Sequence, residues 1–284
     1  MTMQGEVDCK TGDLAVVYRL YPLVSKDPFL FGDSKFDLAR QCLKSFADGL
    51  GSLRVKIWVL LDGCPAPYED LCRELLCRYE YQLIKLPGVG GVQTFEKQIE
   101  ILCSQTFSEN VYLAEDDYLY SPKSIEVALQ AFLEIGQPSF MTLYDSADYY
   151  SMKFHEYERR VTIILGSHWQ AVSCTTFTFM ATKTILNETK TVFSTYASGN
   201  FDSSIWMSLT KKGIWNFSAL TRFIIGRDRD FIRIAKAWLF GWKQIVSGKT
   251  YQLLSPIPSL ATHLERESVA PVVDWMAIVS HDSE

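Results

Sequence analysis

The sequence has no apolar run long enough to cross a membrane, and it has none of the short motifs that identify the commonest nucleotide-binding enzymes. A membrane-spanning helix needs about 18–20 apolar residues, and no stretch approaches that length. The first residues, with Glu6 and Asp8, do not follow the plan of a signal peptide. We find no P-loop, G-x-S-x-G elbow or kinase signature. Gly88-Val-Gly-Gly is not a dinucleotide fingerprint, because Gln93 holds the third glycine position.

Cysteine pairs and excess basic charge are also missing. The seven cysteines are odd in number and include no C-x-x-C pair, so we expect free, mostly buried thiols in a reducing cytosol and no zinc site. His155-Glu156 lacks the second histidine of the H-E-x-x-H zinc motif. A net charge of −5 argues against a general nucleic-acid binder. We therefore expect a cytoplasmic protein that does not bind nucleic acid.

What the chain does have is a regular alternation of strand and helix patterns. With 284 residues, 48% of them apolar, it suits one large α/β unit without repeats or linkers. Apolar runs predict strands at 14–20, 55–61, 81–86 and 111–114, and helical spacing predicts helices at 37–50, 68–79 and 94–104. Strands separated by helices are typical of a mostly parallel sheet.

The second half of the chain is less regular. We expect strands at 140–144 and 175–181, a helix at 202–212, and a tail from residue 255 that is mainly extended loop. Long excursions of this kind often shape a substrate pocket.

Three carboxylates, Glu115, Asp116 and Asp117, directly follow the predicted strand at 111–114. Asp62 likewise follows the strand at 55–61, and the carboxyl ends of parallel strands meet in the crevice where open α/β sheets bind ligands. Crowded like charges repel unless a cation lies among them, and oxygen ligands suit Mg²⁺ or Mn²⁺. The acidic triplet and Asp62 together indicate a nucleotide and metal site, whereas an isolated acidic triplet would more often be a solvated turn.

With these features placed, the chain resembles the GT-A-fold glycosyltransferases, in particular bacterial enzymes of glycosyltransferase family 2. The resemblance covers most of the chain from Leu14 to about Trp275. It depends on four segments: the strand at 14–21, Leu-Leu-Asp-Gly at 60–63, Ala-Glu-Asp-Asp-Tyr-Leu-Tyr at 114–120, and Pro-Ser-Leu-Ala-Thr-His-Leu-Glu at 258–265. The third segment corresponds to the family's DxD motif. The resemblance implies a single GT-A domain over 1–284, with a mixed, mostly parallel sheet, a nucleotide-sugar-binding half at 14–135 and an acceptor-binding half at 136–284.

The resemblance also implies roles for individual residues. Asp117 stands where the family binds a divalent metal, Mn²⁺ or Mg²⁺, and His263 would complete that metal site. Glu115 stands where the first acid of the motif contacts the ribose or the metal shell. The remaining positions implied to face the nucleotide or the donor sugar are Arg19, Tyr21, Asp62, Lys97, Gln98 and Asp116.

Sugar transfer with inversion also needs a base that takes the proton of the acceptor hydroxyl. The candidate is Asp202 in Gly-Asn-Phe-Asp-Ser-Ser, which lies just before a predicted helix. Asp is equally common as a helix N-cap, so both interpretations remain open. His263 is open in the same way, since a lone loop histidine is often only hydrogen-bonded.

Residues 222–249 interleave basic and aromatic side chains, with Phe231, Ile234, Ala235, Trp238 and Trp242 at helical spacing. A helix packed on the core with a solvated basic edge explains this pattern, and a helix that contacts an anionic membrane explains it too. The second interpretation would place the protein at the inner face of the membrane.

We therefore expect a metal-dependent glycosyltransferase of the hexosyltransferase type. It would move a sugar from a UDP- or GDP-sugar to a glycan or lipid-linked acceptor in polysaccharide or other glycan assembly. Two alternatives are a nucleotidyltransferase with a similar sheet and a non-catalytic carbohydrate-binding protein. The first would want a Gly-rich, basic loop after the first strand, where this chain has Tyr21-Pro-Leu-Val-Ser. The second would not need the acidic triplet and His263 together.

Overall fold

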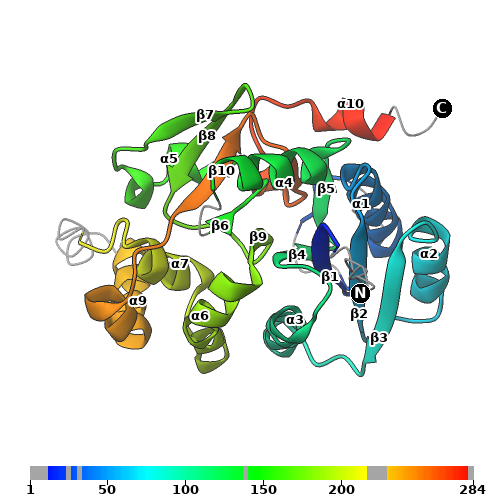
Figure 1. The fold of residues 1–284 in the computed structure, drawn as a ribbon, viewed down its shortest axis with the longest axis horizontal. Coiled ribbons are helices and arrows are strands. Elements are labelled where there is room, and N and C mark those ends of the chain that lie inside the picture. The colour runs from blue at the N-terminus through cyan, green and yellow to red at the C-terminus, as the bar shows by residue number, and fades with distance from the viewer. Residues whose placement is uncertain (1–11, 24–26, 31–33, 137–139, 216–228, 281–284) are drawn as a thin grey trace, which may run out of the picture.

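The structure is a computed structural model that describes residues 12–23, 27–30, 34–136, 140–215 and 229–280. Figure 1 shows one central sheet that runs across the molecule, with helices on both of its faces. The first half of the chain contributes β1 (Leu14–Leu20), α1 (Lys35–Gly49), β2 (Val55–Asp62), α2 (Pro67–Leu75), β3 (Glu80–Leu86), α3 (Gly91–Ser104), β4 (Asn110–Glu115), β5 (Tyr118–Tyr120) and α4 (Ser124–Glu134).

The second half completes the sheet and covers it. Its elements are β6 (Phe140–Met141), α5 (Asp148–Ser151), β7 (Val161–Ile164), β8 (Ser167–Val172), β9 (Phe179–Thr182), α6 (Lys183–Phe193), α7 (Asp202–Thr210), α9 (Arg229–Ser247), β10 (Leu253–Ile257), β11 (Ala261–His263) and α10 (Trp275–Ser280). All seven elements predicted between residues 14 and 114 are present, and the α7 prediction is confirmed with an earlier end.

The sheet has nine strands in the order β3-β2-β1-β4-β9-β6-β10-β8-β7. β9 and β8 run antiparallel to their neighbours, and the remaining strands share one direction. This arrangement confirms the expected α/β fold with a mixed, mostly parallel sheet flanked by helices. Because β1 lies between β2 and β4, its carboxyl end is next to the carboxyl ends of both, where the predicted acids stand.

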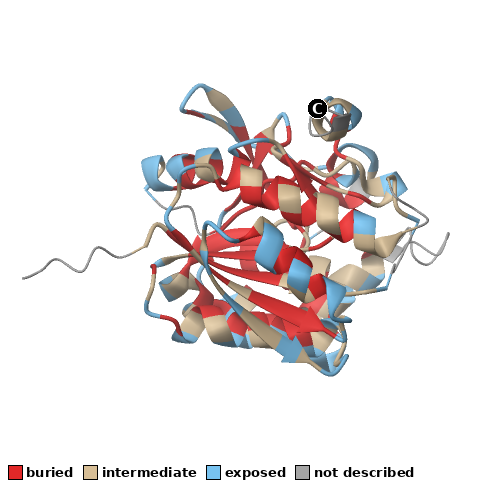
Figure 2. Ribbon diagram, turned by 90° about the vertical axis from the view of Figure 1, so that its right-hand side faces the viewer, coloured by how far each residue is buried: buried red, intermediate tan, exposed pale blue. Residues whose placement is uncertain are grey.

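Alternation along β1 divides the core into two layers. Leu14, Val16 and Tyr18 pack against α1, α2 and α4 on one face, whereas Ala15 and Val17 pack against α3, α6 and α7 on the other. Figure 2 shows the strands of the sheet buried between these helices. The sheet therefore holds the ends of its strands rigidly in place.

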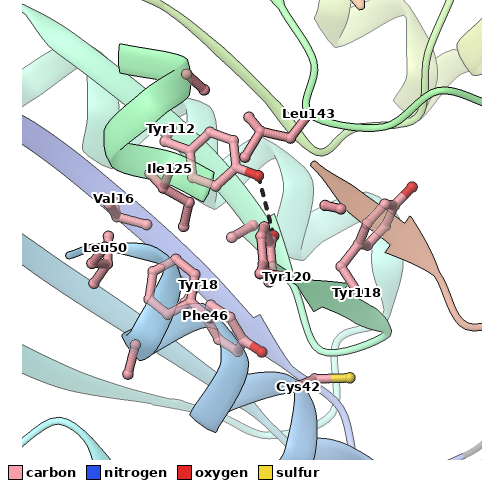
Figure 3. Packing of buried hydrophobic residues seen from close by; sticks show 14 of the residues in the cluster. Val16, Tyr18, Cys42, Phe46, Leu50, Tyr112, Tyr118, Tyr120, Ile125 and Leu143 are labelled. Carbon is pink, nitrogen blue, oxygen red and sulfur yellow. Dashed lines mark hydrogen bonds between the residues drawn. The ribbon is translucent and has the colours of Figure 1, made fainter. Parts of the chain in front are cut away.

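A cluster of tyrosines lies in the first of these layers (Figure 3). The Tyr112 and Tyr120 hydroxyls are hydrogen-bonded at 3.1 Å, and the Tyr118 hydroxyl is 2.7 Å from Thr176 Oγ1. Tyr118, Tyr120 and Tyr112 are at most 1% exposed. The aromatic residues that flank the triplet in the sequence therefore anchor its backbone in the core.

The prediction that the tail from residue 255 is mainly extended loop is wrong. β10 lies inside the sheet between β6 and β8, β11 pairs with β5, and α10 follows. Proline is rare inside a sheet because it lacks an N–H donor, which made Pro256 a sign of a loop. Within β10, only Leu253 and Leu254 pair with β6, so Pro256 lies beyond the end of β6 and has β8 as its single neighbouring strand.

Other boundaries also differ from the sequence expectations. β6 is shorter than the predicted strand at 140–144, and β9 begins later than the predicted strand at 175–181. α4, α6, β7 and β8 were not predicted from the sequence. Cysteines in the described part of the chain are free, and Cys42, Cys72 and Cys174 are buried.

Candidate active site

The first ion pair of the candidate site, Arg19 with Glu115, joins the neighbouring strands β1 and β4 at their carboxyl ends. Arg19 at the end of β1 lies opposite Glu115 at the end of β4 in the parallel register. Arg19 Nη1 donates to Glu115 Oε1 at 3.2 Å, and the guanidinium lies 5.4 Å from the centre of the Tyr21 ring. Arg19 therefore neutralises Glu115 and is itself held by Tyr21.

A second cation holds the middle acid of the triplet. Lys35 Nζ lies 3.0 Å from Asp116 Oδ2, and both side chains are largely buried. The backbone N–H of Tyr21 also donates to Asp116 Oδ2, at 2.9 Å. Lys35 is the first residue of α1, and Ser34 caps that helix by accepting from the Asp37 N–H. A cation at a helix N-terminus is unfavourable by itself, so the position of Lys35 is explained by Asp116.

The third acid meets a histidine from the far end of the chain. His263 Nε2 lies 3.2 Å from Asp117 Oδ2 across a separation of 146 residues. The antiparallel pair β5–β11 sets this contact, because His263 stands opposite Tyr118 and the Leu264 N–H donates to the Asp117 carbonyl at 2.8 Å. Glu265 Oε2 lies 3.6 Å from His263 Nδ1, on the other side of the ring.

These contacts give the three acids different pKa values. Burial and the nearby Asp117 charge raise the pKa of Glu115 to about 7, although Arg19 opposes the shift. Burial raises the pKa of Asp116, and Lys35 only partly offsets it. Burial also opposes ionisation of Asp117, but His263 and the two cations outweigh it and lower the pKa. Asp117 is therefore the acid of the triplet that most strongly favours the charged form.

Asp117 and His263 offer a donor set that fits a divalent ion. Asp117 Oδ1 is buried and has no hydrogen-bond partner, which is unusual for a carboxylate oxygen. No cluster of three or more His, Cys, Asp or Glu side chains arranged for a metal occurs in the ranges that the structure describes. Mg²⁺ and related ions are often bound by one or two carboxylates with substrate phosphates as further ligands. The residues fit such an open site, with Glu115 tied to Arg19 rather than aimed at an ion.

Two cavities meet at the His263 and Glu265 side chains. One, of about 130 Å³, is lined by residues that include Arg19, Lys35 and Asp117. The other, of about 340 Å³, is lined by residues that include Asp202, Asp148, Arg233 and Thr176. Since His263 and Glu265 line both, Asp116 and Asp117 face a space that adjoins the one lined by Asp202. A larger apolar groove of about 550 Å³ between α3 and α6 shares no residue with either cavity.

Asp202 lies at the beginning of α7 but is not the helix cap. Phe201 is the capping residue and makes no side-chain cap hydrogen bond, whereas Asp202 Oδ1 accepts from the Ser203 N–H at 2.6 Å. An acid in the first turn is stabilised by the positive end of the helix. Asp202, the first residue of α7, lines the cavity of about 340 Å³.

The structure places three other predicted site residues outside this cluster. Asp62 is fully buried and accepts from the backbone N–H groups of Val89 at 2.7 Å and Gly90 at 2.9 Å. Gln98 is buried and donates to the carbonyls of Val17 and Ala114, so it braces β1 against β4. Lys97 points outward and pairs with Glu100.

Asp62 nevertheless acts on the site through the turn that it holds. The turn leads into α3, and a Cβ atom added at Gly91 would lie 3.6 Å from Arg19 Nη2. Two glycines that precede Gly91 in this turn, Gly88 and Gly90, have positive φ angles of 83° and 88°, which other residues rarely adopt. Asp62 thus positions the backbone beside Arg19.

Sequence reasoning missed several residues that line the two cavities. They include the charged Lys35 and Glu265 and the polar Thr176. A lysine directly after a Ser N-cap was a usable signal for Lys35, because a cation there needs an acidic partner. Glu265 had no comparable signal, since its position depends on the long-range pairing of β11. Arg233, which lines the cavity with Asp202, belongs to the basic and aromatic segment at 222–249 that the sequence singled out.

The basic and aromatic segment at 222–249 is partly described. Residues 222–228 lie outside the described ranges, and α9 covers most of the rest. Ile234 and Trp238 are partly buried as expected, but Trp242 is 53% exposed and Ala235 is also exposed. In the described residues, no helix is long and apolar enough to cross a membrane.

The strand order and the helices on both faces of the sheet define an α/β fold with a mixed, mostly parallel sheet, as the sequence predicted. No family model matches the sequence, and no curated protein matches it. Among solved structures, the chain is similar to *S. aureus* TarS in complex with UDP-GlcNAc, with 10% identity over 85% of this chain and 58% of that chain, and a TM-score of 0.44.

Two other solved structures are similar at the same level. One is a *Desulfovibrio desulfuricans* protein described as a nucleotide-diphospho-sugar transferase, with 12% identity over 82% of this chain and 98% of that chain, and a TM-score of 0.43. The other is the mannosyltransferase PcManGT of *Pyrobaculum calidifontis* in complex with GDP-Man and Mn²⁺, with 13% identity over 50% of this chain and 39% of that chain, and a TM-score of 0.34. In a longer TarS structure the match spans only 30% of that chain. At these similarities, the function has to be inferred from the side chains of this chain.

Proposed function

We propose that this chain is a glycosyltransferase that takes a sugar from a UDP- or GDP-sugar. The observation that carries the proposal is the contact of Asp117 with His263, 146 residues apart, at 3.2 Å. It lies at the carboxyl end of the parallel strands, beside two basic side chains and next to the cavity that contains Asp202. The proposal includes a hexosyl donor, a glycan or lipid-linked acceptor, and peripheral membrane contact through residues 222–249.

The charges support a diphosphate donor bound together with a divalent ion. Arg19 balances Glu115 and Lys35 balances Asp116, which leaves Asp117 and Glu265 as the excess negative charges around His263. A diphosphate would add further negative charge to this small cavity. Mn²⁺ or Mg²⁺ bound by Asp117 and His263 would neutralise that charge and stabilise the leaving group.

The remaining chemistry is assigned to residues of this chain. Arg19 and Lys35 orient the diphosphate, and the sugar faces the larger cavity. Asp202 takes the proton of the acceptor hydroxyl as the hydroxyl oxygen bonds to the anomeric carbon and the bond from that carbon to the diphosphate breaks. This single displacement inverts the configuration, whereas a retaining reaction would not require Asp202 in this role.

The test uses UDP-sugars and GDP-sugars with and without Mn²⁺, in binding calorimetry and in transfer assays. We expect Asp117→Asn and His263→Gln to remove Mn²⁺-dependent donor binding. Asp202→Asn should bind donor normally and lose about 100-fold or more in transfer rate. Asp70→Asn, at an exposed acid on α2, is the matched control. Equal Mn²⁺-dependent binding in Asp117→Asn and the control would refute the metal role. Donor binding by a wild-type protein that transfers no sugar would favour a binding protein.

A further inference from the structure

The outer face of α9 carries a continuous apolar stripe. Ile232, Leu239, Trp242 and Val246 are 40%, 71%, 53% and 66% exposed, and the smaller Ala235 between them is also exposed. Their spacing of three or four residues puts them on one side of the helix. An exposed apolar surface of this regularity usually marks an interaction site.

The opposite side of the same helix is packed. Ala237 and Ile245 are buried with Met207 of α7 and Ile214 in a small separate core. Figure 1 shows α9 at the end of the molecule away from β3 and α2, with α7 beside it. The helix is thus fixed by one face and presents the other face outward.

The charge along α9 is positive, although the whole protein has a net charge of −5. Lys236 and Lys243, seven residues apart, border the stripe on one side, and Trp215 and Trp238 pack together at 5.1 Å on the other. Asp230, the single acid in the helix sequence, is 8% exposed and pairs with Arg233 at 2.7 Å. Apolar residues flanked by lysine and tryptophan are typical of helices that lie in a membrane interface. A second copy of this chain would bring the same lysines, and within α9 as described the single acid, Asp230, is already paired with Arg233.

The stripe also borders the cavity that contains Asp202. Ile232 belongs to the stripe and the next residue, Arg233, lines the cavity. On the facing turn, Phe201, the residue before Asp202, is 41% exposed, and the centre of its ring lies 3.6 Å from Lys236 Nζ. A surface on which α9 rests would therefore be close to the opening of this cavity.

We propose that the outer face of α9 docks on an anionic lipid bilayer, and that the acceptor is a membrane-anchored molecule whose polar head enters the Asp202 cavity. The docking part stands on the α9 surface alone, whereas the acceptor part rests on the proposed function. The stripe supplies apolar contact with the bilayer, and the lysines attract the anionic head groups.

The docking test is co-sedimentation of the full chain with vesicles of phosphatidylcholine alone and of equal parts phosphatidylcholine and phosphatidylglycerol. We expect binding to the mixed vesicles, weaker binding at high salt, and about a tenfold lower partition coefficient for Leu239→Glu. Ile163→Glu is the matched control, because Ile163 is 67% exposed on β7 and lies on a different element. Equal partition of the two variants, or of the wild type into both vesicle types, would overturn the docking.

Two further measurements separate this inference from the proposed function. Donor binding in the presence of Mn²⁺ should be the same for Leu239→Glu and the wild type, so a failure of donor binding in both would count against the enzyme and not against the docking. Sedimentation velocity without lipid should show the same species for both proteins. A dimer that Leu239→Glu dissociates, in a protein that ignores vesicles, would assign the stripe to a second copy and refute the proposal.

Discussion

The substitution Asp62→Asn distinguishes a ligand-binding role of Asp62 from a positioning role. Both carboxylate oxygens accept backbone N–H groups of the turn at Val89 and Gly90, and the side chain is fully buried. An amide has the same shape but offers one acceptor, so its NH₂ group would face one of the two N–H donors. The variant therefore loses one charge-assisted hydrogen bond and leaves a buried donor unpaired.

The expected cost of this change is about 2–3 kcal/mol in the free energy of unfolding. Asp62→Ala removes both acceptors and should cost about 4 kcal/mol. For a chain of this size, about 2–3 kcal/mol lowers the melting temperature by about 5 °C or more. Donor affinity should fall as well, because the turn that Asp62 holds adjoins Arg19.

The assay combines urea denaturation with donor binding for Asp62→Asn and for Asp70→Asn. Asp70 is an exposed acid in a surface ion pair with Arg73, so its substitution should change the stability by less than about 0.5 kcal/mol. The reasoning is refuted if Asp62→Asn is as stable as Asp70→Asn and still loses donor binding. That result would mean that the carboxylate contacts the nucleotide directly, as the family resemblance implied.

Two further predictions concern buried charges. Lys35→Met leaves the buried Asp116 carboxylate without its cation and should lower the free energy of unfolding by about 3 kcal/mol in urea denaturation. Lys44→Met is the control, because it removes the more exposed pair with Asp48 on the same helix and should cost less than about 1 kcal/mol. Equal costs for the two variants would contradict the pairing of Lys35 with Asp116. Burial raises the pKa of Asp145 to about 6, so the folded state binds this proton more tightly than the unfolded state. The resulting stability of about 2–3 kcal/mol is present at low pH and is lost as the pH rises from about 4 to about 6. Asp145→Asn should abolish that loss in calorimetric melting curves across this range, and parallel curves for the two proteins would contradict it.

The sequence predicted the half of the fold whose signals are local. β1, β2 and β4 are mostly apolar because both faces of a strand inside the sheet are buried, and an acid lies at the carboxyl ends of β2 and β4. The position of the acidic triplet at a sheet edge followed from this regularity. The pairing of its members with Arg19 and Lys35 did not follow, because it depends on strand register and on the approach of α1.

The second half could not be predicted in the same way. β10 enters the sheet from the far end of the chain and carries a proline that normally excludes a central strand. β5 and β11 have three residues each, too few for a periodic pattern, yet their pairing is what brings His263 to Asp117. The contact of His263 with Asp117 is thus set by two strands of three residues each.

In the sequence, the triplet indicated a cation site, because like charges so close together seemed to need an added cation. The structure supplies two cations from the chain itself, and Glu115 and Asp116 are balanced before any ion is considered. Asp117 is left with a lowered pKa, one oxygen toward His263 and one buried oxygen without a partner. A divalent ion is therefore not required to hold the turn together. Its place in the proposed reaction follows from the charge of the diphosphate, which would add to the excess negative charge that Asp117 and Glu265 already leave around His263.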